Sequence, residues 1–531
     1  MNRKILVLPA VVGLLAPALV ACGNDGAGGG EGATVVVGTT DRIEATEDAP
    51  APLDPAAAYD VSTWNIFRNT FQTLLRLPRS GTEPEAEAAK ECEFTDRRSA
   101  QYRCTLREGL TFSNGHSLTA EDVVFSIDRV LELEDPSGPS SLLSNLDRVE
   151  APSEHEVVFH LKTPDATFPH KLATPAAAIV DSEVYPADGV REGYEITGSG
   201  PYVVESFDPD KGTAVLVRNE RYTGGLEVKN GRVELRFFED SEAMEKALRD
   251  GDIDVMNRSM SPEQIARLSS EKGSDIDVVE MSGQEIRYLV FNTDDPVAGR
   301  EAVRKAIARI VNRGELVRDV YQRTAEPLYS MVPVGLTSHS NSFFNTYGEP
   351  DVKAARALLE EADISTPVRV RFTYTSDHYG EVTAEEFKVL VKQLNASGLF
   401  DATAEGVPWK TYRPTAAEQK YQVYGMGWFP DFPDPENFLA PFFAEDNFLG
   451  ATYKNEELLK IIPRTRTKAD REAAIEDLVR AQDIVAEDVP VLPLWQGKQY
   501  IAAREDVTGV EWALNSSAVL QLWELGRATE G

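Results

Sequence analysis

Three cysteines carry the most nucleophilic side chains of this chain of 531 residues. Cys22 follows an apolar run over residues 5–20, and a thiol in that position can form a thioether bond to a second molecule. Cys92 and Cys104 lie in the string ECEFTDRRSAQYRC, each in a short strand-like piece beside a polar turn. The cysteines therefore predict covalent modification near the N-terminus and disulfide chemistry farther along the chain.

The residues before Cys22 have the layout of a secretory signal peptide. Two basic residues precede the apolar run, which is too short for a comfortable membrane span. The string LVAC at 19–22 resembles the lipobox of bacterial lipoproteins, which implies that residues 1–21 are removed and that Cys22 carries palmitate-type acyl chains. Two acyl chains suffice for a stable anchor. An ordinary cleaved signal with an incidental cysteine, or an uncleaved anchor, is the alternative.

The second pair of cysteines is expected to form a disulfide. A hairpin that turns at residues 95–99 would bring Cys92 and Cys104 within bonding range. An exported protein meets an oxidising environment, which favours the bridge. Two buried free thiols are the alternative.

Other reactive residue types form no recognisable site. The six histidines are scattered and show no metal-ligand spacing. The sequence has no G-x-S-x-G elbow, no Walker A string and no dinucleotide fingerprint. Most surface carboxylates are simply solvated, so a glycosidase-like pair is not singled out. We therefore expect no enzyme activity, no metal and no cofactor.

Net charge and chain length limit the possible partners and the possible architecture. The chain has 87 acidic and 54 basic residues, with a formal net charge of −33, which argues against nucleic acid as a partner. Its length exceeds what one hydrophobic core usually supports, so two or more lobes are expected. Residues 22–33 lack apolar periodicity and are expected to form a flexible tether.

From Thr34 onward, strand-like and helical patterns alternate, which is typical of a mixed α/β protein. The main expected strands are at 33–40, 286–293 and 489–496. Helical spacing is found at 60–77, 117–133, 300–312 and 471–488, and the segment 240–256 is expected to be a helix closed by Gly251 and followed by a short strand.

Several blocks match one known family at once and in order. They are LREGLTFSNGHSLTAEDVVFSIDRV, TGSGPYVVESFDPDKGTAVLVRNERY, YLVFNT with VRKAIARIVNRGELV, DVKAARALLEEADI and WFPDFPDPENFL. Together, over roughly residues 34–525, they resemble the extracellular solute-binding proteins, family 5, of bacterial ABC importers, which include oligopeptide- and dipeptide-binding proteins.

The resemblance implies a two-lobed, type II periplasmic-binding-protein-like α/β fold, with an extra subdomain in the first lobe and the ligand between the lobes. YLVFNT and PVLPLWQ would be the two crossing strands. Lobe I is then expected at 34–293 and 496–531, and lobe II at 294–495. Gly198 and Gly200 match a Gly-rich turn in which backbones approach closely, or they simply form a tight turn before a strand.

The resemblance also implies a site for the peptide α-ammonium. In the peptide-binding branch, a Trp followed three residues later by Asp marks it, and the matching residues are Trp428 and Asp431. We expect Asp431 to pair with the ammonium and Trp428 to line the chamber. This chain departs from the pattern by placing Phe429 and Pro430 between them, and Asp434 is a competitor for the same role.

Five further residues are weaker candidates for ligand contact. Thr39 and Thr40 lie where the first strand is expected to end at the cleft. Arg287 and Tyr288 enter a crossing strand and would meet a ligand carboxylate, unless they form an ion pair at the hinge. Trp409 lines the chamber or is an ordinary core aromatic residue.

These observations predict a monomeric receptor, lipid-anchored on the outer face of the cell membrane. It would close on an extracellular peptide and deliver it to ABC permease subunits in the membrane. The alternatives are the same fold with a sugar or a metal chelate as cargo, and a surface lipoprotein that acts as a hydrolase or sensor.

Overall fold

The computed structural model describes residues 34–528, except residues 48, 381, 446, 448, 451, 516 and 518. Cys22, the predicted signal peptide and the predicted tether lie outside the described residues. Within the described part, no helix combines the length and the apolar character needed to cross a bilayer.

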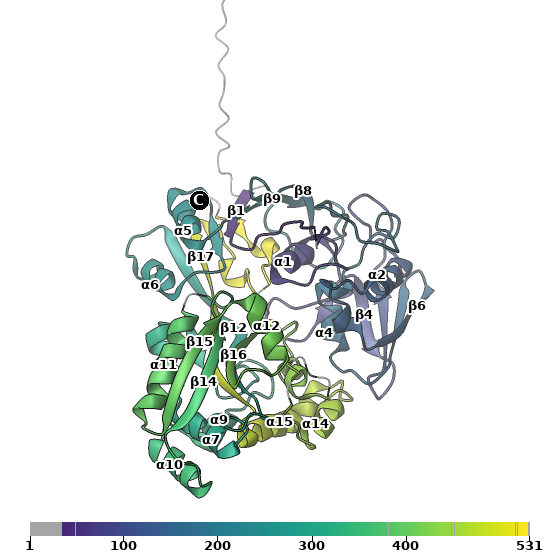
Figure 1. The fold of residues 1–531 in the computed structure, drawn as a ribbon. Coiled ribbons are helices and arrows are strands. Elements are labelled where there is room, and N and C mark those ends of the chain that lie inside the picture. Colours follow the sequence, from purple (N-terminus) through teal and green to yellow (C-terminus); the bar gives the residue numbers. More distant parts are fainter. Residues whose placement is uncertain are drawn as a thin grey trace, which may run out of the picture.

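One eleven-stranded sheet runs through both halves of the molecule (Figure 1). Its two long central strands, β12 (Ile276–Phe291) and β17 (Val491–Arg504), pair antiparallel, and their register shifts between Ser282 and Ile286. Lobe I is built on one side of this shift and lobe II on the other. The expected two-lobed α/β fold with two crossing strands is therefore confirmed.

Lobe I places five strands beyond β17 in the order β11, β1, β10, β9, β8. Their bounds are β1 Thr34–Thr39, β8 Tyr202–Asp208, β9 Thr213–Arg218, β10 Arg232–Phe237 and β11 Val255–Asn257. Helices α1 (Val61–Thr70), α5 (Ser241–Asp250) and α6 (Pro262–Ser270) flank them. Gly251 ends α5 with a φ of 78°, the left-handed conformation that glycine adopts freely.

Lobe II adds three strands beyond β12: β16 (Val423–Trp428), β14 (Val368–Thr375) and β15 (Phe400–Val407). Every residue of IRYLVF, 286–291, is buried, as expected of a strand covered on both faces. The core of lobe II draws apolar residues from Ile286 to Trp495. The lobe bounds derived from the sequence stay a prediction.

Helices cover the sheet of lobe II, and a short strand, β13 (Ala325–Pro327), pairs with β17. The helices are α7 Glu301–Ile310, α8 Arg313–Glu315, α9 Ser342–Tyr347, α10 Val352–Glu361, α11 Thr383–Ala396, α12 Trp409–Ala417, α13 Ala440–Phe443, α14 Leu458–Thr465 and α15 Ile475–Asp488. Figure 1 shows them, mostly in green, below lobe I.

The expected extra subdomain is a four-stranded antiparallel sheet with its own core (blue in Figure 1). Its strand order is β4 (Ala89–Phe94), β5 (Gln101–Leu106), β7 (Glu156–Leu161), β6 (Leu146–Ser153). Helices α2 (Ala120–Leu133), α3 (Ser140–Leu143) and α4 (Phe168–Leu172) pack on it, and β2 (Leu75–Arg76) pairs with β3 (Glu85–Ala86) nearby. As expected, Thr119 caps α2 with Asp122, whose carboxylate accepts the Thr119 N–H at 2.9 Å.

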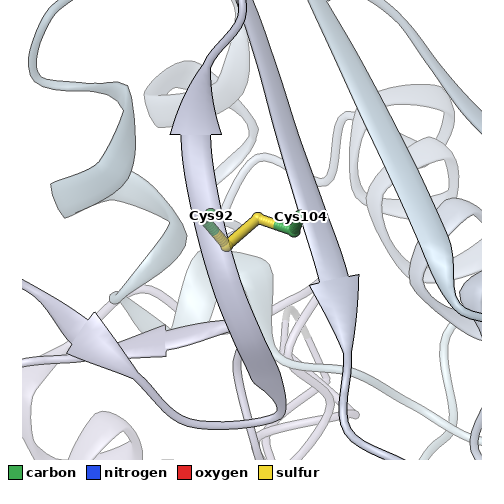
Figure 2. Close-up of a disulfide and its surroundings, with 2 residues drawn as sticks. All are labelled: Cys92 and Cys104. Atoms are coloured by element: carbon green, nitrogen blue, oxygen red, sulfur yellow. A yellow bond between two sulfur atoms is a disulfide. The ribbon is translucent and has the colours of Figure 1, made fainter.

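The disulfide is present. Cys92 and Cys104 lie directly opposite each other on β4 and β5, with their Cα atoms 4.1 Å apart (Figure 2). Closing so short a loop stabilises the fold by about 3 kcal/mol at most. The alternative of two free thiols is ruled out.

Helix α1 is shorter than the apolar spacing over 60–77 predicts, because it ends at Thr70. The Gly-rich turn lies against that end, where Gly200 N–H donates to Thr70 O at 2.9 Å. A Cβ on Gly198 would lie 2.1 Å from the same oxygen. The turn therefore serves a close approach of two backbones, and it satisfies a carbonyl at the end of the helix.

Candidate ligand-binding site

A cavity of about 150 Å³, partly open to solvent, lies where the two lobes meet. Lobe I contributes Tyr59 to Arg68 at the start of α1, and lobe II contributes 429–431 from the loop after β16. The crossing strands contribute 283–285 and 497–499, and the C-terminal tail reaches it near Val519. The cavity thus touches both lobes and the hinge between them, which is where a closing receptor would hold its ligand.

The crossing strands approach each other very closely beside this cavity. A Cβ on Gly283 would lie 2.5 Å from the carbonyl oxygen of Gly497. Gln496 ties the strands together by donating from Nε2 to Gly283 O at 2.8 Å. Glycine is required at Gly283 for space, and the register shift beside it makes this the natural point for the lobes to bend.

The lobe I wall presents aromatic side chains. Asp60 caps α1 by accepting the Thr63 N–H at 3.0 Å, so the helix starts directly at the cavity. Just before it, the ring of Tyr59 lies 5.1 Å from that of Trp64. Tyr59 keeps 39% of its surface exposed. These rings offer flat apolar surface to a ligand backbone or side chain.

Asp431 supplies an anionic group on the opposite wall. Its carboxylate accepts hydrogen bonds from the Tyr59 hydroxyl and, at 3.2 Å, from Asn437 Nδ2. Its own N–H donates to Asn437 Oδ1 at 3.1 Å. No Lys or Arg forms an ion pair with it among the residues that the structure describes. Burial raises the pKa of Asp431, while the two hydrogen bonds oppose that rise.

Trp428 lies behind this wall and does not line the cavity. Its indole Nε1 donates to Asn437 Oδ1 at 3.2 Å, and its ring packs edge-on against Phe442. Phe429, with 40% of its surface exposed, lines the cavity instead. Phe429 and Pro430 are the two residues at which this chain departs from the family motif. The wall is therefore lined by the ring of Phe429 and not by the ring of Trp428, which was expected there.

Asp434 is occupied by a neighbour within lobe II. Arg471 donates to both of its carboxylate oxygens, at 2.8 and 2.7 Å. Both side chains are buried, and the carboxylate also accepts the Glu436 N–H at 2.8 Å. The charge of Asp434 is therefore already paired inside lobe II, and Asp434 is not proposed as a partner for the ligand.

Thr39 and Thr40 are at the end of β1, but neither lines the interlobe cavity. The hydroxyl of Thr39 accepts the Asp41 N–H at 3.1 Å, and that of Thr40 donates to Ser259 at 2.8 Å. Both hydroxyls thus serve contacts within lobe I.

Arg287 and Tyr288 are buried beside the hinge. Arg287 forms an ion pair with Glu285 and lies 4.0 Å above the ring of Tyr379. The hinge ion pair that was the alternative at the sequence level is therefore present. Tyr288 is 1% exposed and packs edge-on against Phe442 in the core of lobe II.

Trp409 begins α12 and stacks on His378, with ring centroids 3.8 Å apart. Its N–H donates to Asp377 at 2.7 Å, and it does not line the interlobe cavity. The stack forms an aromatic cluster within lobe II.

Most lining residues were not identified from the sequence, Tyr59 and Arg68 among them. Tyr59 bonds to Asp431 although 372 positions separate them, and Arg68 enters the cavity from the last turn of α1. The one available signal was that both lie in or beside the segment with helical spacing. In the described part of the chain, no group of three or more His, Cys, Asp or Glu residues could hold a metal ion.

Comparisons with known proteins agree with this geometry. Residues 83–450 match the family described as bacterial extracellular solute-binding proteins, family 5 Middle. The oligopeptide-binding protein OppA of Bacillus subtilis strain 168 is 24% identical, with 93% of this chain and 94% of OppA covered. The probable D,D-dipeptide-binding periplasmic protein DdpA of Escherichia coli K12 is 25% identical, with 87% of this chain and 89% of DdpA covered.

Among solved structures, the periplasmic binding protein DppA from Helicobacter pylori, in complex with peptide STSA, shares the fold. Its TM-score is 0.74 at 19% identity, over 94% of this chain and 99% of that chain. The matching family consists of solute-binding proteins rather than enzymes, as the sequence predicts. The chain therefore belongs to family 5 of the bacterial extracellular solute-binding proteins.

Proposed function

We propose that this protein captures a peptide in the interlobe cavity and delivers it to an ABC importer. The observation that carries the proposal is Asp431, a desolvated carboxylate that faces the cavity with only neutral hydrogen-bond partners. An ammonium about 4 Å away gains roughly 4 kcal/mol at an effective dielectric near 20, before its own desolvation is counted. The α-ammonium of a peptide is such a cation.

The names of the two relatives, OppA and DdpA, also refer to peptides. Hydrogen bonds to the peptide backbone would hold an extended ligand without reading its side chains. Tyr59, Trp64 and Phe429 would then pack against whatever side chains it carries.

Closure of the lobes is the expected mechanism. Tyr59 of lobe I already reaches Asp431 of lobe II, and Ala166 N–H of the subdomain donates to Arg466 O of lobe II at 2.8 Å. A ligand between the walls adds contacts that exist only in the closed state, so it shifts the population toward closure.

We further propose that Cys22 carries lipid and holds the receptor on the outer face of the membrane. The residues before it support this, and a tethered receptor has a raised local concentration at its permease. Mass spectrometry of the N-terminal peptide from membrane-purified protein would detect the acylated cysteine, and an unmodified Cys22 would contradict it.

Native mass spectrometry with a mixture of peptides tests the transport receptor directly. Mass additions equal to intact peptides are the expected result. Peptide fragments would demand a hydrolase instead. Binding of a sugar or a metal chelate, with no peptide bound, would assign another cargo to the same fold.

A further inference from the structure

A second, smaller hollow of about 40 Å³ lies behind α1 in lobe I, and it shares Arg68 and Val519 with the interlobe cavity. Its walls are the inner face of α1, the strand-like segment that follows, and the C-terminal tail up to Trp523. A ligand in the cleft therefore meets this hollow at Arg68.

Two asparagines on α1 hold the tail in place. Asn65 Oδ1 accepts the Leu520 N–H at 3.0 Å. Asn69 donates to Leu520 O at 3.0 Å and accepts the Leu522 N–H at 3.2 Å. Asn65 and Asn69 are one helical turn apart, so both side chains reach the tail. They bond to its backbone at Leu520 and Leu522, as the backbone of a neighbouring strand would. This clamp positions Gln521 and Trp523 in the wall of the hollow that Arg68 also lines.

Three N–H donors in this wall lack a protein acceptor among the described residues. They are Nε of Arg68, Nε2 of Gln521 and Nε1 of Trp523, and all three atoms are buried. Gln521 and Trp523 keep only 2% and 6% of their surfaces exposed. Buried donors in native proteins are nearly always satisfied by protein, water or a ligand, and the three residues that carry these donors all line this one hollow.

Charge points in the same direction. Arg68 donates from Nη1 to Ala173 O at 2.9 Å, and within the described residues it has no carboxylate partner. By contrast, Arg76 and Glu87, which line the same hollow, pair with each other at 3.1 Å. Burial lowers the pKa of Arg68 to about 10, and no neighbouring anion offsets that effect. Arg68 thus has no carboxylate partner of its own in the described part of the chain, whereas Arg76 is shared by Glu85 and Glu87.

We propose that Arg68, Gln521 and Trp523, here called the Arg68 subsite, bind a carboxylate of the ligand. This inference rests on the proposed function and specifies its substrate class as a peptide with an anionic group away from its ammonium. A guanidinium and two neutral N–H donors match the acceptor lone pairs of a carboxylate. The carboxylate is either the peptide C-terminus or an Asp or Glu side chain.

A hydrogen bond and two ring contacts connect the two charged groups along the lobe I wall. Asp431 bonds to Tyr59, the Tyr59 ring lies 5.1 Å from that of Trp64, and Arg68 lies 5.8 Å from the Trp64 ring. A bound peptide would therefore run over the two aromatic rings, from its ammonium at Asp431 to its carboxylate at Arg68. The opposite charges at the two ends would set its direction.

Calorimetry on the full mature protein tests the subsite with matched peptides. One arm compares di-, tri- and tetra-alanine with their C-terminal amides, and the other compares Ala-Glu-Ala amide with Ala-Gln-Ala amide. We expect the form with the carboxylate to bind about tenfold tighter in one of these arms, because charge-assisted hydrogen bonds are the strong ones. The arm that shows the difference identifies the source of the carboxylate.

Three variants test whether the preference for the carboxylate form depends on the Arg68 subsite. Arg68→Met should abolish the preference for the carboxylate form. Trp523→Phe removes only one N–H donor and should reduce the preference by about threefold. Arg148→Met removes an exposed charge from β6 and is the control for net charge, so its preference should match that of the wild type. If Arg68→Met does not fold, Trp523→Phe decides alone.

The outcomes separate the two proposals. Equal binding of carboxylate and neutral forms by the wild type would overturn the subsite and leave peptide capture intact. A preference that survives in both Arg68→Met and Trp523→Phe would also overturn it. Failure of every peptide to bind the wild type would overturn the proposed function together with this inference.

Discussion

The loop from Trp428 to Asn437 contains two carboxylates in opposite settings. At its beginning, Asp431 faces the interlobe cavity and is bonded by Tyr59 and Asn437, both neutral. Three residues later, Asp434 is 2% exposed and accepts two hydrogen bonds from Arg471.

The difference distinguishes the carboxylate proposed to bind the ligand from a structural one. Asp434 has its positive charge inside the protein, so its burial is already compensated. Asp431 is desolvated without an ion-pair partner, and the charge of Lys171 opposes the effect of burial only in part, so a cation that enters from outside compensates it further.

Asp434→Ala should lower the free energy of unfolding by about 3–5 kcal/mol, because it leaves Arg471 buried without its partner. Asp431→Ala should change it by less than about 1 kcal/mol, since its lost hydrogen bonds are offset by relief of the carboxylate's desolvation. Urea unfolding of both variants measures the contrast. Equal losses would show that the two carboxylates do not differ in role.

Asn437→Ala should cost about 1–3 kcal/mol and weaken peptide binding, because Asn437 holds Asp431 and also accepts from Trp428. Asn395→Ala is the control, since Asn395 makes a similar two-bond contact with Ala402 far from the cavity. It should lose stability without losing peptide affinity. A parallel loss of affinity in the control would mean that general destabilisation explains the result.

Tyr59→Phe should cost about 0.5–1.5 kcal/mol and favour the open form, because the hydroxyl bridges the lobes to Asp431. Small-angle scattering of the ligand-free protein should then show a larger radius of gyration. Tyr222→Phe removes a similar hydroxyl that donates to the buried Glu87 within lobe I, and it should leave that radius unchanged. An unchanged radius in Tyr59→Phe would show that this bond does not hold the lobes together.

The smallest effect is a pH dependence at Asp431. Its pKa is raised on folding, so the stability it contributes is full below the ordinary carboxyl pKa and is lost as pH rises through the raised value. Asp431→Asn lacks this loss, so its stability relative to the wild type should increase with pH over that window. Peptide affinity of the wild type should increase over the same window, because only the ionised carboxylate pairs with an ammonium. A flat wild-type affinity would contradict the pairing.

Much of the fold could be predicted from the sequence, because burial shapes the patterns. The apolar run at 286–293 predicted a strand, which the family resemblance identified as a crossing strand, and the Cys92–Cys104 spacing predicted a hairpin with a disulfide. The length of α1 could not be predicted, because the helix ends where Gly198 and Gly200, which are far away in the sequence, contact the backbone of Thr70.

The site was less accessible to sequence reasoning. The family motif predicted Asp431 as the partner of the peptide ammonium. However, no pattern in the neighbouring sequence shows that Arg471 pairs with Asp434 and leaves Asp431 without an ion-pair partner. That choice depends on Asp434 capping the turn that follows it, which orients its side chain toward Arg471. Tyr59 reaches Asp431 only through the meeting of two lobes that are far apart in the chain.

The most direct test compares one peptide with its N-acetylated twin on the wild type and on Asp431→Asn, by calorimetry. The wild type should bind the free-amine form at least about tenfold tighter, and the variant should lose that preference while binding the acetylated form as well as the wild type does. Equal loss of affinity for both forms, or a preference that persists in Asp431→Asn, would contradict the pairing of Asp431 with the peptide ammonium.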